Sequence, residues 1–136
     1  MRAADLYDYA VIRVVPRVER AEFINAGVIL SSAATKFLQA RIELDEARLI
    51  ALAPDVDIET VRRHLAAVSA ICAGTPGSGP IAQLPQRARF HWLTAPRSAI
   101  IQTSPVHAGR CANPQAAIEH LVARLVMTPP RASPKS

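Results

Sequence analysis

The stretch RARFHWLTAPRSAIIQTSPVHAGR, residues 87–110, decides how the rest of the chain can be arranged. It holds the only tryptophan, two of the four histidines and four arginines, and it has no acidic residue. Two short runs, 89–93 and 99–103, flank the turn signal Ala95-Pro96, and side chains of unlike polarity alternate in the first run. Alternation with a period of two is typical of strands. The stretch therefore predicts a β-hairpin.

Within such a hairpin, successive side chains point to opposite faces. Phe90 and Trp92 would then face the core, while Arg89 and His91 would emerge on the other side. Further polar side chains follow the turn, and these are Arg97, Gln102 and His107. Arginine, histidine and glutamine together supply forked donors and a titratable group, a set suited to phosphate or carboxylate.

Three further strands are predicted before this stretch. Residues 7–15 are apolar on both faces, which indicates a central strand covered on two sides, although Arg13 interrupts one face and must pair, reach solvent or face a ligand. Residues 23–30 include Asn25 and Gly27, and a glycine inside a strand predicts a bulge or a close backbone approach. Residues 37–44 alternate, and a five-residue turn makes them the antiparallel partner of 23–30.

Capping signals predict two helices, and residues 45–52 predict a short helical turn. Asp57 suits an N-cap and Gly74 the position after a helix, and Asn113-Pro114 opens a second helix. The predicted fold is therefore an α+β domain over residues 5–128, with a mostly antiparallel sheet of about five strands and two helices on one face. Residues 129–136 are expected to form a disordered, proline-rich tail.

Charge is distributed unevenly along the 136 residues, whose net charge is +5. Residues 1–59 hold seven basic and ten acidic residues, whereas residues 60–136 hold nine basic residues and only Glu119 as an acid. Six arginines lie between Glu59 and Glu119. If they share a face, that face favours phosphate, carboxylate or an acidic protein; the alternative is a solvated surface that neutralises the acidic half.

Signals for catalysis are weak. Cys72 and Cys111 are too few for a zinc framework, and paired carboxylates are absent from residues 87–110, so neither a metal nor a cofactor is predicted. A phosphoesterase with two His-x-Thr/Ser motifs is not matched, because the second residue after each histidine is Leu93 or Gly109. Binding is favoured over turnover. The alternative is a small hydrolase or transferase that uses His91 or His107, or a His107–Cys111 pair, on a phosphorylated or acyl substrate.

Other partner classes follow from composition. The sequence shows no signal peptide and no apolar run of about 18 residues, which predicts a cytoplasmic protein without membrane association. Nucleic-acid binding is a minor alternative, because the aromatic side chains that stack on single strands are nearly missing. Self-association remains open.

Three blocks of the chain resemble a known family. They are YDYAVIRVVP (7–16), EFINAGVIL (22–30) and RFHWLTAPRS (89–98), the last continued by Ile101-Gln102 and by SPVH (104–107). Over roughly residues 5–125 the chain resembles the bacterial domain-of-unknown-function family 3037. The resemblance implies no established activity, cofactor or catalytic residue. It does imply a genomic context beside a kinase related to the HipA toxins, and hence such a kinase as a partner.

The sequence thus predicts a small binding or regulatory protein that engages a HipA-like kinase or an anionic ligand. The residues expected to form the binding site are Arg13, Asn25, Arg89, His91, Arg97, Gln102 and His107.

Overall fold

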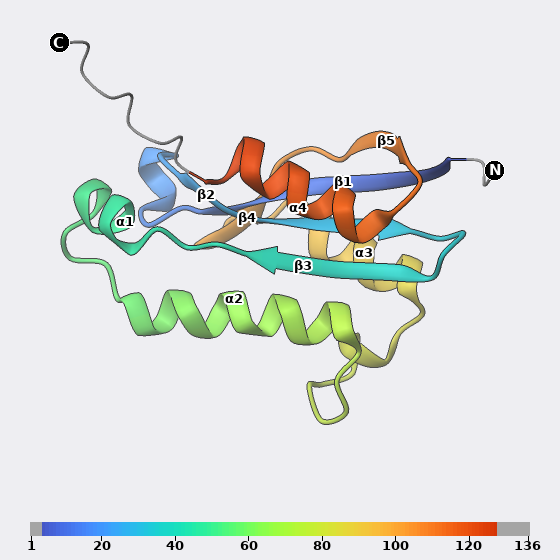
Figure 1. Ribbon diagram of the computed structural model, residues 1–136. Coiled ribbons are helices and arrows are strands. Elements are labelled where there is room, and N and C mark those ends of the chain that lie inside the picture. The colour runs from blue at the N-terminus through green and yellow to red at the C-terminus, as the bar shows by residue number, and fades with distance from the viewer. Residues whose placement is uncertain (1–3, 128–136) are drawn as a thin grey trace, which may run out of the picture.

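A computed structural model of the chain describes residues 4–127 and shows one antiparallel sheet with helices on both faces (Figure 1). The strands are β1 (Asp5–Val14), β2 (Ile24–Ser32), β3 (Phe37–Ile42), β4 (Ile101–Thr103) and β5 (His107–Cys111). The helices are α1 (Glu46–Leu52), α2 (Ile58–Ala73), α3 (Gln86–Thr94) and α4 (Pro114–Leu125), with 3₁₀ turns η1 (Val18–Arg20) and η2 (Ile81–Gln83). The predicted α+β class with five mostly antiparallel strands is confirmed.

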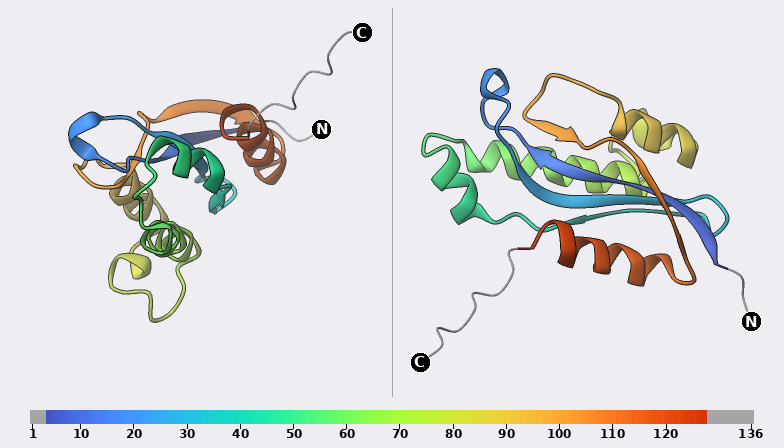
Figure 2. Two further views of the ribbon diagram at one scale, coloured as in Figure 1. Left: turned by 90° about the vertical axis from the view of Figure 1, so that its left-hand side faces the viewer. Right: turned by 90° about the horizontal axis from the view of Figure 1, so that it is seen from above.

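The helices differ from the prediction in number and placement. The described residues contain four α-helices, and they cover both faces of the sheet rather than one (Figure 2). Side chains of α2 and α3 pack with Ile12 and Val14 of β1, whereas side chains of α4 pack with Val11. Among residues 4–127, no helix has the length and apolar character needed to span a membrane.

Strand β1 lies at the centre of the sheet, as its two apolar faces predict. Along one edge it pairs with β2. Its other edge is shared, because β4 pairs with residues 12–14 and β5 with residues 5–9. Ser104 joins these two ladders: its N–H donates to the Val11 carbonyl at 2.8 Å, and its hydroxyl accepts from the Val11 N–H at 2.8 Å. The strand order is β3-β2-β1-β4, with β5 beside β1.

The predicted bulge is present in β2. Gly27 pairs with Ile12, and Asn25 pairs with Arg13, so Ala26 is the extra residue between them. A Cβ atom added to Gly27 would lie only 2.6 Å from the Arg41 carbonyl oxygen of β3. Glycine is therefore required here by the close approach of a neighbouring backbone.

Local signals place α2 and α4 as predicted. The Asp57 carboxylate accepts a hydrogen bond from the Thr60 N–H at 3.2 Å, and Gly74 ends α2 with a left-handed φ of 66°. Asn113 Oδ1 accepts from the N–H groups of residues 115 and 116 at 3.0 and 3.2 Å, and Pro114 occupies the first turn of α4. The predicted helical turn at 45–52 is α1, capped by Asp45.

The predicted hairpin at 89–103 is wrong in its first half. Residues 86–94 form α3, and only the returning segment forms a strand, β4. Phe90 and Leu93 are the buried residues of α3, and a spacing of three places both on one helical face. Gln86 fixes the start of α3, because its Nε2 donates to the Phe37 carbonyl of β3 at 2.8 Å. The predicted tail at 129–136 lies outside the described residues.

Replacing Gly27 by alanine should destabilise the fold, because the added methyl group meets a backbone carbonyl that cannot move independently of β3. We expect the free energy of unfolding to fall by about 1–3 kcal/mol, measured by urea denaturation. Ala33→Ser, in the exposed turn after β2, is the control and should leave the midpoint in place. An unchanged midpoint for Gly27→Ala would contradict the register of β2 and β3.

Candidate functional site

Arg13 is a half-buried cationic side chain on the central strand of the sheet. On β1 it lies between two cross-strand partners, Asn25 of β2 and Gln102 of β4. Its guanidinium carbon is 4.2 Å from the centroid of the Phe23 ring, a cation–π contact. Its Nε is buried and has no hydrogen-bond partner within residues 4–127, and no acid in that range forms an ion pair with Arg13.

Arg13 faces a hollow of about 640 Å³, which we call the Arg13 hollow. The walls come from the end of β1, from the turn around η1 and from the loop before β4, and they include Arg13, Val15, Val18, Phe23, Arg97 and Gln102. No acidic residue among residues 4–127 lines it. The electrostatic potential from its two arginines is therefore positive, which favours an anion.

Arg97 is held in place by its own loop. Its Nη2 donates to the Trp92 carbonyl, its Nε donates to the Ala95 carbonyl at 3.3 Å, and its guanidinium carbon lies 4.4 Å from the centroid of the Trp92 ring. Gln102 supports the same loop, since its Nε2 donates to the Ala99 carbonyl at 2.9 Å. Both side chains line the Arg13 hollow and also a second cavity.

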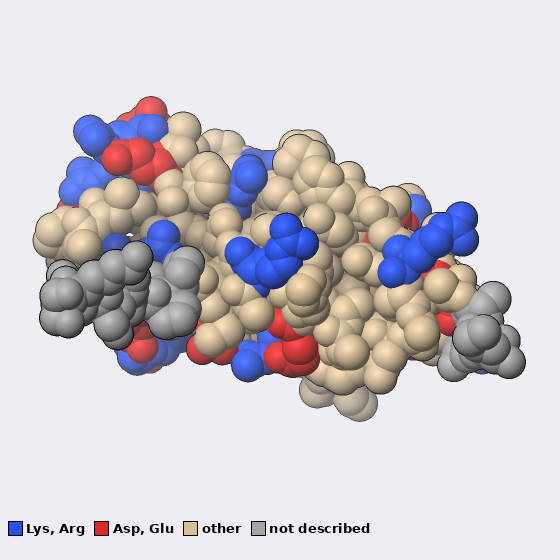
Figure 3. Space-filling view, turned by 45° about the horizontal axis from the view of Figure 1, so that its top comes forward, with Lys and Arg blue, Asp and Glu red and all other residues tan. Residues whose placement is uncertain are grey.

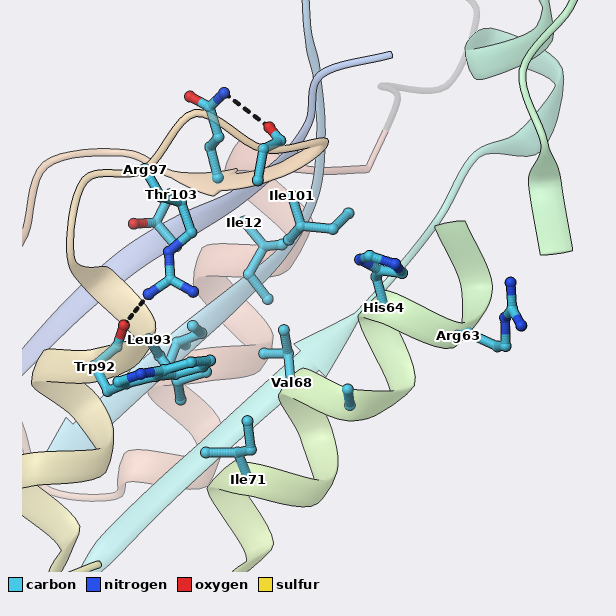
Figure 4. Close-up of a pocket in the computed structure, with 14 residues that line it drawn as sticks. Ile12, Arg63, His64, Val68, Ile71, Trp92, Leu93, Arg97, Ile101 and Thr103 are labelled. Carbon is cyan, nitrogen blue, oxygen red and sulfur yellow. Dashed lines mark hydrogen bonds between the residues drawn. The ribbon is translucent and has the colours of Figure 1, made fainter. Parts of the chain in front are cut away.

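The second cavity, which we call the Trp92 pocket, has a volume of about 410 Å³ (Figure 4). It lies between α2, the end of α3 and β4, and residues of its lining include His64, Val68, Trp92, Leu93, Arg97 and Ile101. Its lining is mainly apolar, and the described part of the chain contributes no acidic residue to it. The segment 97–103 thus forms a wall of both cavities.

Of the seven predicted site residues, three are brought together: Arg13, Arg97 and Gln102 all line the Arg13 hollow. Asn25 lies beside Arg13 on β2, but its Nδ2 donates to the Leu125 carbonyl at 2.9 Å, so its amide is directed to the end of α4. The Oδ1 atom of Asn25 is buried without a hydrogen-bond partner in the described part of the chain.

Arg89 has a structural role instead. Its Nη1 donates to the carbonyls of Ile71 and Cys72 at 2.9 and 2.6 Å, and its Nε donates to the Leu84 carbonyl at 2.9 Å. The first two carbonyls belong to the last turn of α2, where a helix lacks internal partners and carries partial negative charge. Arg89 thus stabilises the end of α2 and connects it to α3.

The two histidines of the predicted site lie apart. His91 is exposed on α3, and His107 is exposed on β5, where its ring centroid is 5.4 Å from that of Tyr9. Neither lines the Arg13 hollow or the Trp92 pocket. His107 and Cys111 are four residues apart on one strand, a separation of about 13 Å. The geometry therefore does not bring them together as a nucleophile and its base.

The arginines of the acid-free segment are used in different ways. Arg62 forms ion pairs with Glu46 and Glu59, and Arg87 pairs with Asp8 at 2.9 Å. These two arginines neutralise acids of the first half of the chain. The charge distribution allowed this role as an alternative to an anion-binding face. Basic side chains form separate groups on the face shown in Figure 3. Within residues 4–127, no three His, Cys, Asp or Glu side chains are grouped so that they could hold a metal ion.

Sequence reasoning missed two aromatic parts of the site. Phe23 is 44% exposed and supports the Arg13 guanidinium, and Trp92, predicted to face the core, is 40% exposed and lines a pocket. The available signal for Phe23 was an aromatic residue placed between a charged segment and a strand. For Trp92 the signal was a helical spacing that buries Phe90 and Leu93 and turns the two residues between them outward.

Comparison with known proteins adds the family. The model of a family described as "Protein of unknown function (DUF3037)" matches residues 9–126. The chain belongs to this family. The DUF3037 match covers residues 9–14 of β1, strands β2 to β5 and the four α-helices of the described chain, so the residues that line both cavities lie within it. No curated protein and no solved structure matches the chain.

The two cysteines should differ strongly in reactivity. Burial raises the pKa of the Cys72 thiol to about 12, so almost none of it is thiolate at neutral pH, whereas Cys111 lies half-buried on β5. Because the thiolate is the nucleophile, iodoacetamide should alkylate Cys111 of the native protein and leave Cys72 unmodified. Mass spectrometry of the digested protein measures both sites, and Cys111→Ser is the matched control. Equal labelling of Cys72 in the native state would contradict its burial on the core-facing side of α2.

Proposed function

We propose that the protein is a binding protein rather than an enzyme, and that the Arg13 hollow binds an oxyanion: the carboxylate or phosphate group of a small molecule. The observation that carries this proposal is the state of Arg13. Its guanidinium is partly buried at the centre of the sheet, and no acid of the described chain pairs with it.

An unpaired cation removed from water costs free energy unless hydrogen bonds or an opposite charge compensate it. The Phe23 ring compensates Arg13 only in part, because a cation–π contact contributes about 0.5–2 kcal/mol. An oxyanion would offer two acceptors to the planar fork of the guanidinium, and such paired hydrogen bonds are among the strongest in proteins. Stacking on Phe23 fixes the plane of the fork in advance, which lowers the entropy lost on binding.

Arg97 and Gln102 support an anion in the same hollow. Arg97 supplies a second positive charge, and its Nε and Nη2 are already oriented by backbone carbonyls. Gln102 pairs with Arg13 across β1 and β4, so its side chain follows the same face of the sheet. Since no acid lines the hollow, no local carboxylate competes with a ligand for these donors.

Other predicted functions stay predictions. A HipA-like kinase as partner rests on the family resemblance alone, and the separation of His91 and His107 from both cavities offers no support for catalysis by either.

Isothermal titration calorimetry with inorganic phosphate and with acetate, at constant ionic strength, tests the proposal. Arg13→Lys keeps the charge but removes the fork, and it should weaken binding of the better anion by about 10-fold or more. Phe23→Leu should weaken it as well, because the guanidinium loses its support. Arg110→Lys, an exposed arginine of β5, is the matched control and should bind as the wild type does.

Two results would refute the proposal: no saturable heat with either anion, or equal affinities for the wild type and Arg13→Lys. Thermal melts of each variant show whether a loss of binding comes from unfolding. If Arg13→Lys does not fold, the anion affinities of Phe23→Leu and Arg110→Lys are compared instead, and equal affinities refute the proposal.

A further inference from the structure

The lining of the Trp92 pocket is mainly apolar, although His64, Gln102 and Thr103 also belong to it. Ile12 of β1 and Ile29 of β2 are fully buried and form part of its lining from the sheet. Val68 and Ile71 of α2 project toward the cavity, and Leu93 closes the end near α3 (Figure 4). A volume of about 410 Å³ lies within the range of roughly 300–1,000 Å³ typical of small-molecule sites.

The mouth of this pocket is cationic. Arg97 extends over the Trp92 ring and is fixed there by the Trp92 and Ala95 carbonyls, while its Nη1 donates to no acceptor among the described residues. Arg63 also belongs to the lining, but its Nη2 donates to the Thr60 hydroxyl at 3.0 Å, and Figure 4 shows it directed away from the cavity. Arg97 is therefore the cation best placed to meet a ligand.

These two properties together define the chemistry of a ligand. An apolar lining gains free energy from a hydrocarbon body, at about 25 cal/mol per Å² buried. A fixed guanidinium with free donors at one end of that lining favours a carboxylate at one end of the ligand. The absence of acidic residues from the lining leaves the positive charge uncompensated within the pocket.

We infer that the Trp92 pocket is a second binding site, separate from the Arg13 hollow, and that it binds small amphipathic carboxylic acids. The apolar chain lies against Val68, Ile71 and Leu93, and the carboxylate accepts hydrogen bonds from Arg97 beside the Trp92 ring. The two sites share Arg97 and Gln102. This inference nevertheless does not depend on the proposed function, because Arg13 and Phe23, on which that function rests, do not line the pocket.

Trp92 makes the inference directly measurable, since it is the only tryptophan of the chain and lines the pocket. Titration with octanoate, with tryptophan fluorescence as the readout, should give a saturable change in intensity or emission maximum. The matched ligand is 1-octanol, which has the same chain without the charge. We expect octanoate to bind about 10-fold more tightly or better, because only its carboxylate can accept charge-assisted hydrogen bonds from the Arg97 guanidinium.

Substitutions test whether the fluorescence change comes from binding in the Trp92 pocket. Arg97→Gln should remove the preference for octanoate over octanol. Ala67→Phe introduces a ring at an exposed lining position and should block both ligands, whereas Ala66→Phe, at an exposed neighbouring position outside the lining, should leave binding intact. Arg13→Lys should not change the octanoate titration, which distinguishes a failure of this inference from a failure of the proposed oxyanion site.

The inference is overturned if octanoate and octanol bind the wild type equally, if Ala67→Phe binds octanoate as the wild type does, or if no saturable change occurs. Near-ultraviolet circular dichroism establishes that each variant is folded. If Ala67→Phe does not fold, the loss or retention of acid preference in Arg97→Gln decides the matter.

Discussion

The structure depends on the burial of both faces of β1. Ala10, Ile12 and Val14 on one face and Val11 on the other are nearly inaccessible to solvent, and burying them requires a helical layer on each side of the sheet. Helices α2 and α3 supply one layer and α4 the other. Because β1 is also long enough to pair with two short strands along one edge, β4 and β5 both attach to it. The central strand therefore positions elements that are distant in sequence.

Both candidate sites follow from this arrangement. The pairing of β4 with the end of β1 brings Gln102 beside Arg13 and draws the loop that carries Arg97 over the sheet edge. One side of that loop faces the Arg13 hollow, and the other faces the Trp92 pocket. A hollow with two arginines and a mainly apolar pocket with a cationic mouth thus share a single wall. Substitutions in this wall are expected to affect both sites, whereas Arg13 and Ala67 belong to one site each.

Features set by local chemistry could be predicted from the sequence. Asp57 and Gly74 bound α2, and Asn113-Pro114 opens α4, because capping depends on a few adjacent residues. The bulge of β2 was predictable as well, because a glycine inside a strand often marks a bulge. Strand β5 was missed, since a short Ala-Gly-containing segment has little strand propensity and forms only because β1 offers it a free edge.

Three of the predicted site residues lie in the site: Arg13 and Gln102 through strand pairing, and Arg97 in the loop before β4. Arg13 and Gln102 meet as expected if their strands are adjacent, but Arg89 was misplaced because alternating polarity over 89–93 resembles a strand. What makes this segment helical is tertiary: Gln86 binds the β3 backbone, and Arg89 binds the last carbonyls of α2. No periodicity in the sequence reports such contacts.

The central claim is that two distinct sites lie on opposite sides of the segment 97–103. Chemical-shift mapping of the ¹⁵N-labelled protein tests it most directly, with separate titrations of phosphate and octanoate. The account predicts that phosphate shifts the amide signals around Arg13, Val18 and Phe23, and that octanoate shifts those around Ala67, Val68 and Trp92. Only the shared wall, residues 97–103, should respond to both. Shifts at the same residues with both ligands, or shifts scattered over β5 and α4, would contradict it.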